Sequence, residues 1–350
     1  MNRHMIARGA AALALGLIVM SGSAVAQVSE MTEREKSLYE AAQKEGSVTW
    51  YITQYGDEAA NKVCSAFNAK YPNVKCNYVR STATVAFQRL AQEIQAKAVQ
   101  ADVFSTNDEF QLVTLKEGDS LEEYLPDNLS HVPQPLKDLG NGGFWNVTAI
   151  GTFGIVYNTN LVKPEDAPTS WADFQDPKWK NKLAIAHPGF SGSAGVWAIA
   201  MRRLYGDDFF KKLADNNPQI GRSIVDGYNL TASGERAVAV QGVYNIIEGR
   251  RKGEPVQEVY PAEGIVAIPG SSAIIKNSPH PNAAKLFMEF LFGTEVSGVL
   301  TADYRLPLRD DVAPAPGVKP LSELTLLSVS SEEQAKIEDL KEMFRDVFGI

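Results

Sequence analysis

The chain has few of the residues that enzyme sites most often need. It contains four histidines and two cysteines in 350 residues, and no G-x-S-x-G, H-E-x-x-H or Walker motif occurs. These motifs are typical of serine hydrolases, zinc proteases and nucleotide hydrolases. His187 and Ser191 suggest a hydrolase, but triad residues are not arranged four positions apart. We therefore expect a protein that is not an enzyme and has no cofactor, with a secreted hydrolase as a remote alternative.

Basic residues are also in short supply. The chain has 34 lysines and arginines against 42 aspartates and glutamates, which gives a formal net charge of −8. A protein that binds nucleic acid needs a basic face to neutralise phosphates. We therefore expect no nucleic-acid partner.

Long apolar runs are absent after the first 26 residues. The chain begins with Arg3 and Arg8 and no acidic residue, continues with an apolar run over 10–20, and reaches the small residues 24–26. This order is typical of a secretory signal peptide over residues 1–26, cleaved after Ala26. The alternative, a transmembrane anchor, needs about 20 apolar residues. We expect the rest of the chain to work outside the cytoplasm.

The two cysteines, Cys64 and Cys76, flank what the sequence indicates is a helix end, a turn at 71–73 and a strand start. A helix that packs back on its following strand could bring the two Cα atoms within disulfide range. An oxidising compartment favours that bridge. The alternative is a metal-binding or catalytic thiol pair, although the spacing matches no zinc pattern.

Strand and helix patterns alternate from residue 47 onward, which predicts the α/β class and a mostly parallel sheet covered by helices. The first predicted strands are 47–52, 74–79 and 101–104, with helices 57–70 and 85–98 between them. Ligands of such sheets bind beyond the carboxyl ends of the strands. The polar residues at these ends are Thr53, Gln54, Tyr55, Ser81, Thr82, Ser105 and Thr106.

The later part of the chain indicates a second α/β unit. A long strand over 148–157 contains Gly151 and Gly154, and glycines inside a strand mark a bend or a close backbone approach. We expect this strand to cross between two lobes with a cleft between them. Further strands are predicted at 182–186, 238–243, 256–268 and 272–275, and helices at 31–45, 193–205, 209–215, 232–237, 282–292 and 332–348.

Five segments, in this order and spacing, carry a family resemblance. They are TSWADFQDPKWKNKLAIAHP (169–188), the Ser191-Gly192-Ser193 turn, ASGERAVAV (232–240), GSSAIIKNSPHPNAAKLFMEFL (270–291) and YRLPLRDDV (304–312). The chain resembles the periplasmic solute-binding proteins of ABC importers, in the branch with ferric-ion, phosphonate and polyamine receptors.

The resemblance implies a two-lobed, type II-like binding fold with a hinge, in which each lobe is a mixed sheet flanked by helices. The expected lobes are 27–150 with 263–305, and 151–262 with 306–350. The resemblance also implies a periplasmic monomer that delivers a small solute to the membrane subunits of an ABC permease.

Two features bear on the solute. Ser191, Gly192 and Ser193 open a helix, where unpaired N–H groups and the helix dipole favour an anion. The alternative is that they form an ordinary helix cap.

Ferric receptors of this family have two adjacent tyrosines after the strand that corresponds to residues 238–243 of this chain. This chain has only Tyr244 at that position. A lone tyrosine at a strand end is more often a packing or hydrogen-bonding residue.

We therefore expect a small anionic organic solute: a phosphonate, a sugar phosphate or a carboxylate. The alternative is ferric iron, with Tyr55, Tyr228 and Tyr244 as ligands. A polyamine would need acidic walls, for which Asp108, Asp226 and Glu235 are the plausible residues. The expected binding residues for the anion are Thr53, Gln54, Tyr55, Ser81, Thr82, Ser105, Thr106, Ser191, Gly192, Ser193 and Tyr244.

Overall fold

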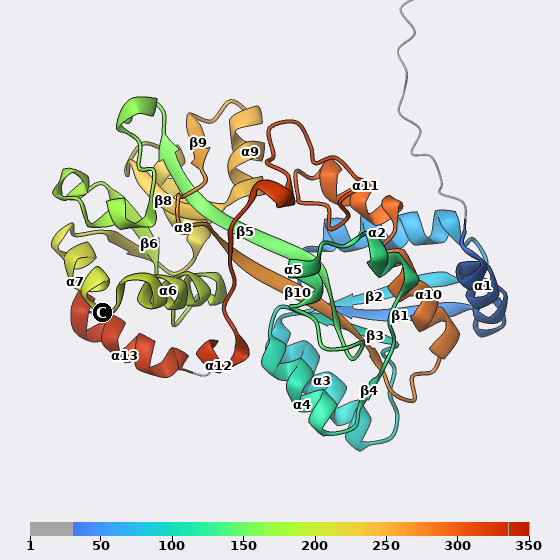
Figure 1. Ribbon diagram of the computed structural model, residues 1–350. Coiled ribbons are helices and arrows are strands. Elements are labelled where there is room, and N and C mark those ends of the chain that lie inside the picture. The colour runs from blue at the N-terminus through green and yellow to red at the C-terminus, as the bar shows by residue number, and fades with distance from the viewer. Residues whose placement is uncertain (1–30, 335, 350) are drawn as a thin grey trace, which may run out of the picture.

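Two α/β lobes joined by shared strands make up the described part of the chain, residues 31–334 and 336–349 of the computed structural model (Figure 1). The predicted signal peptide, residues 1–26, lies outside the described residues. Among the helices that are described, none combines the length and the apolar character that crossing a membrane would take.

The first lobe is built on three parallel strands in the order β2-β1-β3, with β10 antiparallel beside β3. Its core contains Trp50, Phe67 and Phe287, whose rings pack against one another. Its strands are β1 (Ser47–Ile52), β2 (Lys75–Arg80), β3 (Val103–Thr106) and β4 (Leu121–Glu122); its helices are α1 (Glu33–Glu45), α2 (Asp57–Lys70), α3 (Ala83–Gln95), α4 (Glu109–Glu117), α5 (Gln134–Lys137), α10 (Pro281–Leu291), α11 (Thr294–Ala302) and the short η1 (Asp127–His131).

The second lobe has the parallel strands β7, β6 and β8, with β5 antiparallel to β8. Trp171, Trp197 and Phe210 are fully buried in its core. Its strands are β6 (Leu183–Ala186), β7 (Gln219–Gly221), β8 (Val238–Gly242), β9 (Val256–Val259) and β11 (Leu326–Leu327); its helices are α6 (Gly192–Tyr205), α7 (Asp208–Asp215), α8 (Ile224–Ala232), α9 (Val243–Arg251), α12 (Ser331–Gln334) and α13 (Ile337–Phe348), with the short η2 (Pro164–Asp166), η3 (Trp171–Gln175) and η4 (Pro177–Trp179). The short η5 (Leu321–Glu323) packs against the core of the first lobe through Leu321.

Two long strands, β5 (Asn146–Asn158) and β10 (Ile265–Ile275), run through both lobes. The end of β10 pairs with β3 in the first lobe, whereas the end of β5 pairs with β8 in the second. They pair with each other between these ends, with a register shift at Gly270 and Ser271. The predicted crossing strand is therefore present, and it has an antiparallel partner.

The exact lobe boundaries stay a prediction. The strand β10 contributes Val266 and Ile268 to the core of the second lobe and Ile274 to that of the first. After α11 the chain also gives Leu306 and Val318 to the first core before it returns to the second lobe.

One crossing-strand glycine is required by close packing. A Cβ atom at Gly154 would lie 2.7 Å from the carbonyl oxygen of Val259 in the neighbouring strand β9. The backbone approach predicted from a glycine inside a strand is therefore found at this position.

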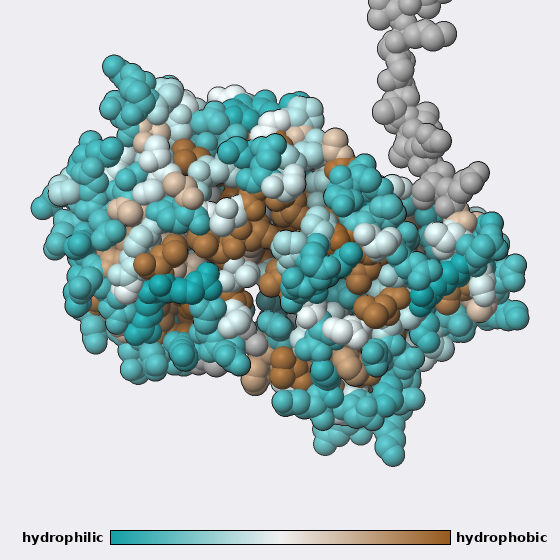
Figure 2. All heavy atoms as spheres, in the orientation of Figure 1, coloured by the Kyte–Doolittle hydropathy of each residue, from teal (hydrophilic) through white to brown (hydrophobic). Residues whose placement is uncertain are grey.

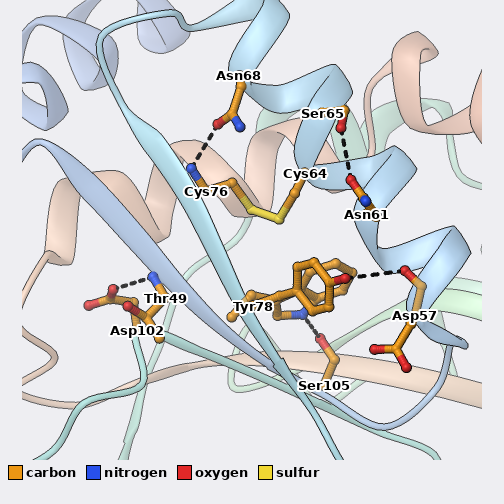
Figure 3. The surroundings of a disulfide bond; sticks show 11 residues. Thr49, Asp57, Asn61, Cys64, Ser65, Asn68, Cys76, Tyr78, Asp102 and Ser105 are labelled. Atoms are coloured by element: carbon orange, nitrogen blue, oxygen red, sulfur yellow. Dashed lines mark hydrogen bonds between the residues drawn. A yellow bond between two sulfur atoms is a disulfide. The ribbon is translucent and has the colours of Figure 1, made fainter.

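The disulfide between Cys64 and Cys76 is present. It joins α2 to β2 with 5.3 Å between the Cα atoms, and the side chain of Asn68 accepts a hydrogen bond of 2.8 Å from the N–H of Cys76 (Figure 3). The helix therefore packs back on its following strand, as the spacing predicted.

Two predictions for the second lobe were wrong. Residues 232–237 are mostly turn, because Gly234 adopts a positive φ of 82°, and the helix lies earlier as α8. Its start is marked by a capping box in which Ser223 and Asp226 satisfy each other's backbone N–H groups.

Residues 256–268 do not form one strand. The strand β9 ends at Val259, and a second strand, β10, begins at Ile265 and continues past Pro269 to Ile275.

Replacing both Cys64 and Cys76 by serine is expected to lower the free energy of unfolding by about 3 kcal/mol, because the bridge restricts the unfolded chain. Urea denaturation of both proteins measures the loss. A reductant should destabilise the native protein and leave the double variant unchanged. If the native protein and the double variant are equally stable in the absence of reductant, the prediction is contradicted.

The variant Gly154→Ala is expected to lose about 1–3 kcal/mol of stability, because its methyl group collides with the backbone of β9. Gly298→Ala in α11 is the matched control, since no atom lies within 4 Å of the added methyl group. We expect that control to be neutral or slightly stabilising. Thermal unfolding of both variants makes the comparison, and a Gly154→Ala protein as stable as the control would refute the close contact.

Candidate functional site

A cavity of about 460 Å³ lies between the lobes, above the middle of β5 and β10. Figure 2 shows the surface hollowed between the two lobes. Residues of both lobes and of the crossing strands β5 and β10 line the cavity, so a solute bound there would lie between the lobes. The lining residues that matter below are Gln54, Tyr55, Asn107, Asp108, Gly192, Ser193, Tyr244 and Arg305.

Five of the eleven predicted binding residues line this cavity: Gln54, Tyr55, Gly192, Ser193 and Tyr244. The amide group of Gln54 donates a hydrogen bond of 3.1 Å to the hydroxyl of Thr148, and its carbonyl oxygen is buried without a partner among the described residues. The loop after β1 and the start of α6 therefore both line the cavity, one from each lobe.

The other six predicted residues lie off the cavity lining: Thr53, Ser81, Thr82, Ser105, Thr106 and Ser191. Ser105 and Thr106 are almost fully buried in the first lobe. The hydroxyl of Ser105 accepts a bond of 2.7 Å from the indole of Trp50, and Thr106 donates one of 3.0 Å to Gln111. Ser105 therefore joins β3 to β1, and Thr106 joins β3 to α4; neither side chain lines the cavity.

Ser191 acts as a helix cap. Its hydroxyl accepts a bond of 3.3 Å from the N–H of Ala194, which is the alternative function considered for this residue. Gly192 and Ser193 follow as the first residues of α6 and lie on the cavity. The first turn of a helix presents N–H groups that have no partner within the helix, together with the positive end of its dipole. The site therefore keeps an anion-attracting helix end at its second-lobe wall.

Arg305 is the main residue that sequence reasoning missed. It follows Tyr304, which has a positive φ of 57°, and its guanidinium carbon lies 4.1 Å from the ring centroid of Tyr244 and 5.8 Å from that of Tyr55. Its Nε is buried without a partner among the described residues. The residue lies within the YRLPLRDDV segment, so a signal was present, but nothing local distinguished this arginine as a cavity residue.

The second contact of this kind lies outside the cavity. The guanidinium of Arg251, at the end of α9, lies 4.9 Å from the ring centroid of Tyr304. Helix α9 and the loop at 304–305 therefore each place an arginine on the other's tyrosine. These paired contacts join the first turn and the last turn of α9 to the chain that follows α11.

Asp108 is the one acidic residue on the cavity. It caps the start of α4, where its carboxylate accepts a bond of 3.1 Å from the N–H of Phe110. Burial raises the pKa of Asp108 above its usual value, against the lowering effect of the N–H groups of Phe110 and Gln111.

The three tyrosines of the iron alternative are not brought together. Tyr55 and Tyr244 share the cavity, but Tyr228 is in α8 and donates its hydroxyl hydrogen bond to Glu254, away from the cavity lining. The hydroxyl of Tyr55 donates to the carbonyl of Thr148 at 3.2 Å. Burial also raises the pKa of Tyr55 well above its usual value, against the charge of Arg305.

Within the described residues, one group of three side chains has the geometry to hold a metal ion, and it is not in the cavity. His131, Asp310 and Asp311 lie together on the exposed surface. Asp311 is already paired with Arg309, whose guanidinium donates two bonds to its carboxylate. This pairing reduces the negative charge that a cation would need.

Residues 92–329 match the family described as bacterial extracellular solute-binding protein. The chain belongs to that family. A putative 2-aminoethylphosphonate-binding periplasmic protein of Salmonella typhimurium is 27% identical to this solute-binding protein over 285 residues, which covers 77% of each chain.

Solved structures share its fold. Iron-bound HitA from Pseudomonas aeruginosa superposes with a TM-score of 0.71 at 21% identity, over 86% of this chain and 99% of the other. AfuA from Actinobacillus pleuropneumoniae, with fructose-6-phosphate bound, gives a TM-score of 0.67 at 24% identity, over 87% and 99%. The likeness confirms the predicted two-lobed binding-protein fold.

Proposed function

We propose that this solute-binding protein captures a small organic anion in the cavity between its lobes and delivers it to the membrane subunits of an ABC permease. The observation that carries the proposal is the pair of positive features on the cavity. Arg305 lines the cavity beside Tyr244 and Tyr55, and the start of α6 lies on the wall formed by the second lobe.

Both features suit a phosphonate, a phosphate or a carboxylate. A guanidinium group binds planar or tetrahedral oxyanions through parallel N–H donors, and a helix start binds them through backbone N–H groups. Arg305 follows α11 of the first lobe, whereas α6 belongs to the second. An anion that contacts both would favour the conformation in which the lobes are closed.

The family relationship supports the receptor function. Proteins of this family bind solutes, and the relative in Salmonella and the AfuA structure are named for a phosphonate and a sugar phosphate. The relative is also named as periplasmic, which supports that location. The proposal includes a receptor that has no catalytic activity of its own and works as a monomer.

A thermal-shift screen over phosphonates, sugar phosphates and carboxylates tests the solute class. A ligand at a hundred times its Kd should stabilise the protein by about 2.7 kcal/mol, because it binds the folded state alone. We expect at least one organic anion to give this shift and neutral sugars to give none. A screen in which no anion shifts the protein would refute the proposal.

With an anion from that screen, Arg305→Gln is expected to weaken binding by about 10- to 100-fold, since a bond to a charged group contributes about 1.5–3 kcal/mol. Arg251→Gln is the matched control, because it removes the same kind of contact with a tyrosine outside the cavity. Calorimetric titration of both variants measures the difference. Equal affinities would show that Arg305 does not hold the anion.

Ferric iron remains the second candidate because two tyrosines, Tyr55 and Tyr244, face one cavity. Phenolate-to-iron charge transfer would colour the protein. We expect the purified protein with excess ferric citrate to stay colourless and unshifted in thermal unfolding. A visible absorption band that fades in Tyr244→Phe would favour iron over the organic anion. If Tyr244 instead binds the anion, the same variant should weaken that binding by about 0.5–1.5 kcal/mol, without colour.

A further inference from the structure

A second pocket, here called the β6–β7 pocket, lies on the second lobe where β6 and β7 end and α13 packs beside them. Its volume is about 480 Å³, and none of its lining residues lines the cavity between the lobes. The loop between β6 and α6 contributes His187, Gly189 and Phe190 to this pocket, whereas Gly192 and Ser193, just after them, line the cavity. A volume of this kind suits a small organic ligand.

The β6–β7 pocket is positively charged, although the chain has a net charge of −8. Its lining has three basic residues, Arg222, Lys341 and Arg345, against one acidic residue, Glu338. Lys341 and Arg345 each pair with a glutamate three residues earlier in α13, Glu338 at 2.6 Å and Glu342 at 3.6 Å. Both glutamates are largely exposed, and exposed pairs of this kind are weak. The two cations are therefore available to another anion.

Arg222 has no salt bridge within the described residues. Its guanidinium carbon lies 5.2 Å from the ring centroid of Phe190. Asp226 is close in the chain, but its carboxylate accepts hydrogen bonds of 2.8 and 2.9 Å from the backbone N–H groups of Arg222 and Ser223, and it is not on the pocket lining. The five N–H donors of the guanidinium thus have no protein acceptor in the part of the chain that the structure describes.

His187 adds a neutral donor. Its Nδ1 accepts a hydrogen bond of 2.9 Å from the N–H of Gly189, so the ring hydrogen of the neutral imidazole is on Nε2. Burial, and then the charges of Arg345 and Lys341, lower the pKa of His187, which favours this neutral form. Guanidinium, ammonium and imidazole groups therefore all line one pocket, and all three donate hydrogen bonds to oxyanions.

Phe190 is the apolar part of the pocket. Its side chain is 66% exposed, and its ring centroid lies 5.0 Å from that of His187. Its contacts with His187 and Arg222 hold the ring at the pocket while most of its surface stays open to solvent. A flat ring laid on Phe190 would bury apolar surface and gain an aromatic contact. An anion without a ring would leave this surface uncovered.

We propose that the β6–β7 pocket is a second binding site, which takes a small aromatic anion with its ring on Phe190 and its phosphate or carboxylate group on Arg222 and His187. The site is separate from the cavity between the lobes. The inference goes beyond the proposed function and does not depend on it.

Three probes separate the two halves of this ligand: phenyl phosphate, inorganic phosphate and benzyl alcohol. Imidazole NMR of the full-length mature protein at fixed pH reads the site directly, because no histidine lines the cavity between the lobes. The His187 resonance, assigned with His187→Gln, is expected to shift saturably with phenyl phosphate, while those of His131 and His280 stay in place. Phenyl phosphate should bind about three- to tenfold more tightly than inorganic phosphate, and benzyl alcohol should give no shift.

Two variants assign the groups. Arg222→Gln is expected to weaken the binding of phenyl phosphate by about 10- to 100-fold. Arg251→Gln is its matched control, because it removes a similar contact with an aromatic ring, 4.9 Å from that of Tyr304, outside the pocket. Phe190→Ala should make phenyl phosphate and inorganic phosphate bind equally. The replaced side chains lie at the surface, so the thermal midpoints should stay close to that of the native protein.

No saturable shift of His187 with phenyl phosphate, or an affinity unchanged in Arg222→Gln, would overturn the inference and leave the proposed function standing. Equal binding of phenyl phosphate and inorganic phosphate by the native protein would overturn the assignment of an aromatic ligand, and equal binding of benzyl alcohol would overturn that of an anion. The proposed function fails instead when no anion depends on Arg305, whatever the His187 resonance does.

Discussion

The sharing of β5 and β10 by both lobes is the constraint on which the rest of the structure depends. The two strands pair with each other, and in addition β10 pairs with β3 in the first lobe and β5 pairs with β8 in the second. The register shift at Gly270 and Ser271 interrupts the pairing of β5 with β10, and Gly270 also lines the cavity. The strands that join the lobes and the floor of the cavity are therefore the same.

Much of the fold was predictable because it follows from local patterns. The strand at 47–52 and the helix at 57–70 were found at the predicted bounds, since β-branched and aromatic residues in one and regular apolar spacing in the other leave little ambiguity. The errors arose where long-range pairing decides the outcome. The strand β10 passes through Pro269, which lies opposite Ile150, because its long-range pairing with β5 fixes its path, and no local pattern records that pairing.

The candidate site was predictable to the same limited degree. The rule that ligands bind at carboxyl ends of strands selects Gln54 and Tyr55, which line the cavity, but it could not tell which strand-end side chains face inward. Ser105 is turned into the core because Trp50 and Ser272 need a hydrogen-bonding partner there. Arg305 escaped detection because its place depends on Tyr244 and Tyr55, both far away in the sequence.

An acidic chain can hold an anion because binding depends on local charge and not on the total. The contact of Arg305 with the ring of Tyr244 adds to this local effect, since the cation–π attraction holds the guanidinium on the cavity lining. A side chain held in this way loses less conformational freedom when an anion arrives, and the affinity gained per hydrogen bond is correspondingly larger. Tyr244 therefore holds Arg305 on the cavity lining through its ring, whatever its hydroxyl group does. This contact accounts for a single tyrosine at this position without a metal ion.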